Sequence, residues 1–179
     1  RGCSCTQYAN PDFVMTLKIF AALALVALAA AGFLVVTQKQ RAPDVAFSTL
    51  QGETFRTADL RGKVVLVNFW ATTCTSCIKE MPALKAIQEK FEARGYQTVA
   101  VAMDYDPPAQ VAAFVERSAL PFTFVLDRDG SIARGFEGVR LTPTSYVLDR
   151  RGQIVQKILG EPDFDKLHGL LEQLLAEPA

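Results

Sequence analysis

An apolar strand pattern that runs directly into two closely spaced cysteines is the feature that most limits how this chain folds. The uncharged run at residues 64–67 predicts a buried strand, and apolar residues recur at helical spacing after Cys77. Cys74 and Cys77 are therefore expected to open a helix. Residues three apart share one helix face, which brings the two cysteines within the short Cα separation that a disulfide needs. The pattern predicts a redox dithiol.

The first cysteine of the pair is the better nucleophile. Cys74 is expected among the free N–H groups at the positive end of the helix, which favour a thiolate. We therefore assign Cys74 as the nucleophile and Cys77 as the resolving thiol. An accidental pair and half of a zinc site are the alternatives. A structural zinc needs four ligands, but Cys3 and Cys5 precede a hydrophobic segment and His168 lies in a distant helical pattern, so no metal site is predicted.

Charge and length exclude some classes of function. Lysine plus arginine equals aspartate plus glutamate at 19 each, so the chain has no basic field to hold a nucleic-acid backbone. We expect no nucleic-acid partner and no cofactor. A length of 179 residues accommodates one domain with a proper core and an accessory segment.

The accessory segment is a hydrophobic stretch near the N-terminus. Residues 19–36 carry no charge and, at about 1.5 Å per residue, are just long enough to span a bilayer. A cleaved signal peptide and a buried soluble helix are the alternatives, but apolar character continues past the small-residue sites where cleavage would occur. We expect an uncleaved anchor, with this division of the chain: a tail at 1–14, which precedes the first methionine, a signal-anchor at 15–37, a linker at 38–43 and a folded domain at 44–179.

The folded part reads as alternating strands and helices. We expect a β-hairpin from residues 45–50 and 53–56, a loop at 57–63, a helix from the cysteines to Gly95 that Pro82 kinks, a helix that starts at Pro107 and another capped by Asp163. Further strands are expected at 64–70, 97–103, 122–126, 144–148 and 153–159.

Several motifs in order along the chain resemble the TlpA and ResA type of membrane-anchored thioredoxin-like proteins. The matching residues are 62–71, the Cys74–Cys77 pair, 80–82 and 141–149. The resemblance implies an α/β thioredoxin fold with an N-terminal β-hairpin and a central β-α insertion, preceded by one transmembrane helix.

The resemblance also implies roles for individual residues. Pro143 matches the cis-proline that lies beside the dithiol, and the backbone of Thr142 is then expected to pair with an extended client. Trp70, Thr73, Thr142 and Pro143 are the expected client-binding residues. Thr73 departs from the pattern, because many members of the family carry an aromatic residue there.

A proton-handling residue is expected one helical turn after Cys77. Asn68 stands where thioredoxin has a buried aspartate, and an amide cannot accept and release that proton at neutral pH. Glu80 matches a ResA-type glutamate and is the natural replacement. The alternative is an ordinary solvent-facing helix glutamate.

The function implied by the resemblance is thiol-disulfide exchange outside the cytoplasm. We expect a monomeric enzyme in the cell inner membrane, with a single membrane pass and its domain in the periplasm or extracytoplasmic space. It would reduce client disulfides, for example in cytochrome c maturation, and be re-reduced by a membrane thiol carrier. Net oxidation or isomerisation of clients is the alternative within the enzyme class. A non-catalytic binding protein or metal chaperone is the alternative outside it.

Overall fold

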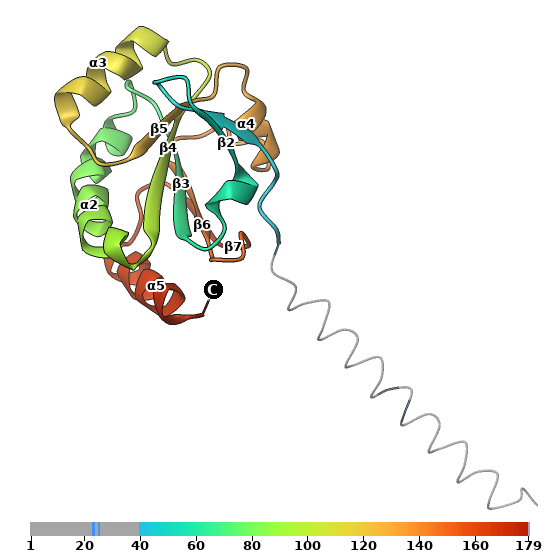
Figure 1. Ribbon diagram of the computed structural model, residues 1–179. Helices are drawn as coiled ribbons and strands as arrows, with labels where there is room; N and C mark the ends of the chain where they lie inside the picture. The colour runs from blue at the N-terminus through green and yellow to red at the C-terminus, as the bar shows by residue number, and fades with distance from the viewer. Residues whose placement is uncertain (1–22, 24, 26–39, 179) are drawn as a thin grey trace, which may run out of the picture. The chain divides into compact units, whose positions relative to one another are not determined.

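The computed structural model describes Leu23, Leu25 and residues 40–178 (Figure 1). Leu23 and Leu25 are helical. The remainder of the predicted anchor, the tail, Cys3 and Cys5 lie outside the described residues. Within the described part of the chain, no helix is both long enough and apolar enough to cross a membrane. The chain divides after Gln38, and the fold below belongs to the second unit.

A five-stranded sheet of order β5-β4-β3-β6-β7 forms the centre of the domain. Strands β3, β4 and β5 are parallel, whereas β6 and β7 are antiparallel to their neighbours. The strands are β3 (Val64–Trp70), β4 (Tyr96–Ala102), β5 (Thr123–Leu126), β6 (Thr144–Leu148) and β7 (Ile154–Leu159).

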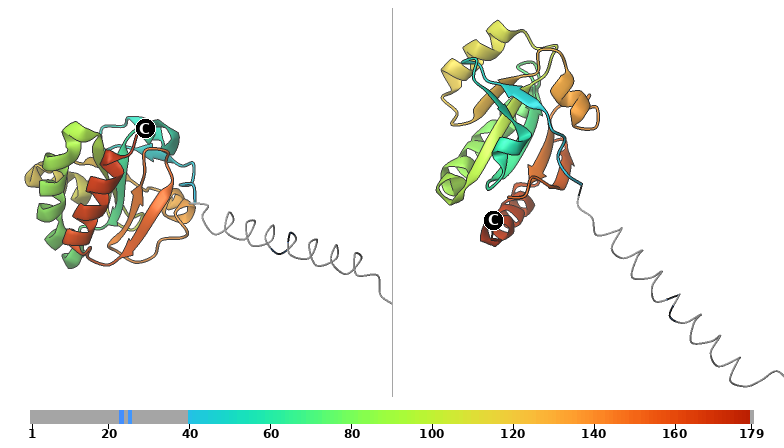
Figure 2. Two further views of the ribbon diagram at one scale, coloured as in Figure 1. Left: turned by 90° about the horizontal axis from the view of Figure 1, so that it is seen from below. Right: turned by 45° about the vertical axis from the view of Figure 1, so that its right-hand side comes forward.

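Both faces of this sheet are covered (Figures 1 and 2). Helices α2 (Thr75–Phe91), α3 (Pro108–Ser118) and α5 (Phe164–Ala176) lie on one face. The hairpin of β1 (Ala46–Ser48) and β2 (Thr54–Arg56), the 3-10 turn η1 (Thr57–Leu60) and α4 (Ser131–Gly135) lie on the other. A second 3-10 turn, η2 (Glu92–Arg94), links α2 to Gly95, whose left-handed backbone ends the helical segment.

Central strand β3 is buried on both sides, which explains why all of its residues except Asn68 are apolar. Its side chains alternate between the faces. Val65, Val67 and Phe69 join the core under the hairpin and α4, whereas Val64 and Leu66 pack against α2 and α5. Asn68 falls between Leu66 and Trp70 on the helical face. The alternation therefore turns a buried amide toward α2.

The expected elements are largely present, and the differences are local. The hairpin forms, although β1 is shorter than the predicted strand, and residues 57–60 make a 3-10 turn instead of a loop. Helix α4 is an addition to the expected fold. Asp127, at the end of β5, accepts hydrogen bonds from the backbone N–H groups of Ile132 and Ala133 and so holds the start of this short helix. A helix of 5 residues leaves too little periodicity to be recognised in a sequence.

Strand directions bring several loops to the edge of the sheet at which Cys74 lies. Strands β3 and β4 end there, because they are parallel and Trp70 pairs with Ala102. Strand β6 begins there, since Thr144 lies opposite Phe69, and β7 ends there, since Leu159 lies opposite Thr144. The segments after β3, after β4 and before β6 therefore surround the dithiol.

Candidate active site

The two cysteines form a disulfide at the start of α2, with an S–S distance of 2.06 Å and a Cα–Cα distance of 5.3 Å. Cys74 is the N-cap of the helix, and its Sγ accepts a hydrogen bond of 3.2 Å from the backbone N–H of Cys77. Ser76 Oγ lies 3.5 Å from the same sulfur. Polar hydrogens thus surround Cys74 Sγ, and such donors stabilise negative charge on sulfur after reduction.

The two cysteines differ in exposure. Cys74 is partly exposed, whereas Cys77 is 0% exposed and packs in a cluster with Trp70 and Met81. An incoming disulfide can therefore reach only the first cysteine. This difference fits the assignment of Cys74 as nucleophile and Cys77 as resolving thiol.

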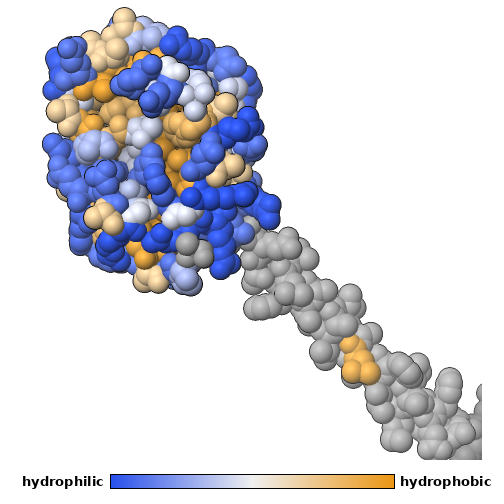
Figure 3. Space-filling model, viewed as in Figure 1, coloured by the Kyte–Doolittle hydropathy of each residue, from blue (hydrophilic) through white to orange (hydrophobic). Residues whose placement is uncertain are grey.

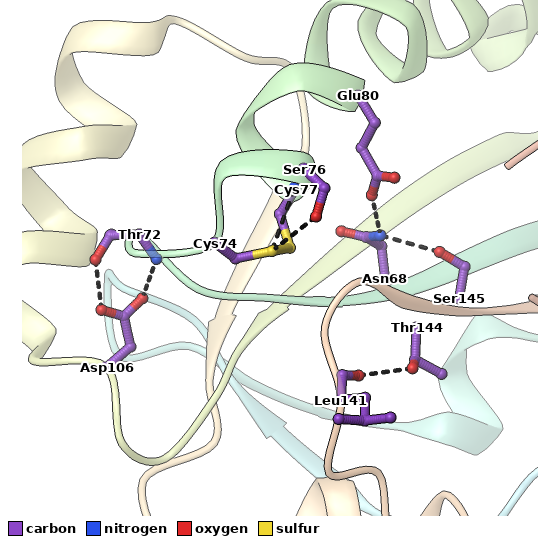
Figure 4. Close-up of a disulfide and its surroundings, with 10 residues drawn as sticks. All are labelled: Asn68, Thr72, Cys74, Ser76, Cys77, Glu80, Asp106, Leu141, Thr144 and Ser145. Atoms are coloured by element: carbon purple, nitrogen blue, oxygen red, sulfur yellow. Dashed lines mark hydrogen bonds between the residues drawn. A yellow bond between two sulfur atoms is a disulfide. The ribbon is translucent and has the colours of Figure 1, made fainter. Parts of the chain in front are cut away.

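A buried polar network lies behind the cysteines (Figure 4). Asn68 Nδ2 donates hydrogen bonds of 2.9 Å to Glu80 Oε1 and 2.9 Å to Ser145 Oγ. Asn68 and Ser145 are opposite each other in the β3–β6 pairing, and Glu80 reaches them from α2. Glu80 is only 1% exposed, so the alternative of a solvent-facing helix glutamate is wrong.

Burial makes this carboxyl group a weak acid. It raises the pKa of Glu80 from 4.5 to about 7, with the negative charge of Glu161 adding to the rise and the hydrogen bond from Asn68 opposing it. The second oxygen, Oε2, is buried and has no hydrogen-bond partner among the described residues. A carboxyl group in these surroundings exchanges its proton near neutral pH.

The segment before β6 borders the site, as expected. The Thr142–Pro143 peptide bond is cis, and Thr144 Oγ1 donates a hydrogen bond of 2.7 Å to the carbonyl of Leu141. Pro143 is buried and Thr142 is partly exposed. Within residues 40–178, the backbone N–H and C=O of Thr142 form no hydrogen bond. They remain available to an extended peptide.

Trp70 and Thr73 differ in what they can offer a client. Thr73 is exposed beside Cys74. The Trp70 ring is 0% exposed and packs against Phe114 and Phe124, with ring centroids 5.0 and 5.8 Å away. The expectation that Trp70 contacts a client directly is therefore corrected: it supports the site from the core.

Two residues of the site were missed from the sequence. Asp106, in the segment after β4, accepts a hydrogen bond of 2.6 Å from the backbone N–H of Thr72 and another of 2.6 Å from its hydroxyl. Asp106 lies 34 positions from Thr72, and Ser145 lies 77 positions from Asn68. No local pattern reveals such contacts. Hydrophilic residues within a buried strand or a few residues after one are the only signal the sequence offers.

Comparisons with known proteins agree with this site. The Redoxin family profile matches residues 37–174. The chain belongs to the Redoxin family. It is 33% identical over 135 residues to thiol-disulfide oxidoreductase ResA of Bacillus anthracis, which covers 75% of this chain and 77% of that protein. ResA of Geobacillus kaustophilus is 31% identical over 163 residues, covering 86% and 92%.

Solved structures of similar proteins share the fold. A thiol:disulfide interchange protein of the thioredoxin family from Chlorobium tepidum superposes with a TM-score of 0.70 at 25% identity, covering 78% of this chain and 99% of that one. The α/β thioredoxin-like fold with its N-terminal hairpin is thereby confirmed. With its Cys74–Cys77 disulfide, this member of the Redoxin family is a thiol-disulfide oxidoreductase of the ResA type.

Proposed function

We propose that this oxidoreductase reduces disulfides in client proteins outside the cytoplasm. The observation that carries the proposal is the difference between the two sulfurs: Cys74 is partly exposed, while Cys77 is buried on the side of α2 that leads to Glu80. The first sulfur is placed to meet a client and the second to release it.

The reaction proceeds in two exchanges. In the reduced enzyme, the Cys74 thiolate attacks one client sulfur, forms a mixed disulfide and expels the other client sulfur as a thiolate. Cys77 then loses its proton, attacks the Cys74 sulfur and expels the second client thiolate. The client gains two electrons and the enzyme becomes the Cys74–Cys77 disulfide. Glu80, with a pKa of about 7, is suited to accept the Cys77 proton and return it to solvent.

A protein client fits the surface around Cys74 better than a small thiol. Among residues 40–178, the large hydrophobic side chains that are exposed are Tyr105, Leu141 and Leu159. Tyr105 follows β4, and Leu141 and Leu159 flank β6, so all three lie at the edge of the sheet that carries Cys74. Exposed apolar side chains beside a reactive group favour contact with an apolar polypeptide.

The location and the electron supply rest on the sequence and on the family. Residues 19–36 are long and apolar enough to anchor the chain in the inner membrane, with the domain in the periplasm or extracytoplasmic space. That compartment oxidises thiols, so a membrane thiol carrier must re-reduce the dithiol. Apocytochrome c is the client class best known for proteins of the ResA type. We extend it to this chain as part of the proposal.

Trapping of clients tests the proposal. A Cys77→Ala variant should accumulate mixed disulfides with extracytoplasmic proteins, because the second exchange is blocked, whereas Cys74→Ala should trap none. Glu80→Gln should form mixed disulfides at the normal rate but resolve them more slowly near pH 7. Mixed disulfides that formed on Cys77 in the Cys74→Ala variant would overturn the assignment of roles.

A further inference from the structure

A shallow groove of about 340 Å³ runs beside Cys74, between the loop that precedes it and helix α3. Thr72 and Thr73 form one wall. Gln110, Ala113, Phe114 and Arg117 form the other. These four helix positions share one face of α3, because they are separated by three or four residues. The groove therefore lies along a single helix face, immediately next to the nucleophile.

The walls of the groove are held in place before any client arrives. Asp106 binds the backbone and the hydroxyl of Thr72, and the Thr72 hydroxyl lies 3.4 Å from Gln110 Oε1. The ring of Phe114 packs against the buried ring of Trp70. Figure 4 shows Thr72 and Asp106 on the side of Cys74 opposite to Asn68 and Glu80, so this groove is separate from the proton-handling network.

The lining chemistry selects a particular kind of occupant. Phe114 and Ala113 make the α3 wall of the groove partly apolar. Apolar surface alternates with hydrophilic patches on the face of the domain drawn in Figure 3. Arg117 is exposed and is the only charged residue that lines the groove. It forms no ion pair or hydrogen bond within residues 40–178. An arginine guanidinium binds a carboxylate through a planar pair of hydrogen bonds.

We propose that this groove recognises the client, and that it prefers segments in which an apolar residue and a carboxylate lie close to the reactive cysteine. The inference rests on the proposed function, because it concerns the clients of the same dithiol. Arg117 is a specificity-determining residue in this view. The occupant is an extended polypeptide, since the backbone of Thr142, in the segment that borders the dithiol, is free to pair with one.

Symmetrical disulfide-linked peptides provide the test. Each peptide carries Leu-X on both sides of its cysteine, where X is Glu, Gln or Lys, and is mixed with the reduced full chain in detergent. Trp70 is the single tryptophan of the chain and lies in the same cluster as Cys77, so its fluorescence can report oxidation of the dithiol. The wild-type protein should react about two- to fivefold faster with the Glu peptide than with the Gln peptide, the range for an exposed charge pair. The Lys peptide should be slowest, and added salt should reduce the differences.

Two charge-reversal variants distinguish an effect of the groove on the peptide rates from an effect of the protein's net charge. Arg117→Glu should invert the order, so that the Lys peptide reacts fastest. Arg140→Glu changes the net charge equally but lies outside the groove, and it should keep the wild-type order. Equal wild-type rates for the three peptides, or an inverted order in both variants, would overturn the proposal that the groove recognises the client. The proposed reductase function would still stand. Failure to reduce any peptide would overturn the proposed function together with the inference.

Discussion

Asp106 binds Thr72 through both carboxylate oxygens, with one bond to the backbone N–H and one to the hydroxyl, each of 2.6 Å. Thr72 is two residues before Cys74, and Asp106 is 4% exposed. The segment after β4 thereby fixes the loop that delivers the nucleophile. Asp106 is a positioning residue, because it acts on Cys74 through the backbone of Thr72.

Removal of this carboxylate should loosen the loop. Asp106→Ala leaves the Thr72 N–H without its partner, and we expect a loss of about 1–3 kcal/mol in the free energy of unfolding and slower alkylation of Cys74 in the reduced protein. Asp106→Asn should recover most of both, since an amide can accept from the N–H and donate to the hydroxyl oxygen. Denaturation and alkylation rates measured on both variants decide the point. If Asp106→Asn behaved like Asp106→Ala, the negative charge of Asp106, and not its hydrogen-bond geometry, would be the important property.

Leu141 should contribute to client affinity. It is 64% exposed in the segment before β6, beside the free backbone of Thr142. Leu141→Ser removes apolar contact area, which predicts a KM for a protein client about three- to tenfold higher, with kcat little changed. Leu159→Ser should raise KM less and serves as the comparison, because this residue is 65% exposed at the end of edge strand β7, two strands from β3. Equal effects of the two substitutions on KM would show that client affinity does not depend on where the exposed leucine lies.

Asn68 should hold the Glu80 pKa down. Its hydrogen bond stabilises the charged carboxylate and opposes the effect of burial. Asn68→Leu keeps a similar volume but removes the donor, so the Glu80 pKa should rise above about 7. The pH profile for resolution of the mixed disulfide should then shift to higher pH. An unchanged profile would mean that Glu80 does not govern this step.

The fold could be read from the sequence where the signal was local or continuous. The predicted bounds of β3 match the structure because the strand is buried on both faces and is apolar except at Asn68. The cysteines open α2 as predicted, and Asp163 caps α5 by accepting a hydrogen bond from the N–H of Lys166. Each of these features depends on a few neighbouring residues.

The site was harder to predict from the sequence than the fold, because its contacts join segments that are distant along the chain. Helical spacing alone left the burial of Glu80 undecided, since it depends on β3 and β6 placing Asn68 and Ser145 beneath it. Burial of Trp70 follows from the arrival of α3 above the sheet. The role of Asp106 depends on the parallel pairing of β3 with β4, which brings their ends together. The burial of Glu80, the burial of Trp70 and the role of Asp106 therefore all depend on tertiary structure.

Glu80 should also make the stability of the oxidised protein depend on pH. Its pKa is about 7 in the folded protein and near 4.5 when unfolded. Below pH 4.5 the group is protonated in both states and costs nothing. Between pH 4.5 and 7 the unfolded chain releases the proton while the folded protein retains it, so the free energy of unfolding falls as pH rises. Above pH 7 the loss is constant, at no more than about 3.5 kcal/mol.

Glu80→Gln removes this titration while it keeps the oxygen that accepts from Asn68. The free energy of unfolding of Glu80→Gln, relative to that of the wild-type protein, should therefore increase from pH 4 to pH 8. Glu89→Gln is the matched control, since Glu89 is exposed on the same helix and pairs with Lys85 at 3.8 Å. Urea unfolding of the full chain in detergent, with the disulfide intact, gives these free energies at each pH. A difference that stayed constant across the range would show that folding does not raise the Glu80 pKa, which would leave the carboxylate a poor base for the Cys77 proton near pH 7.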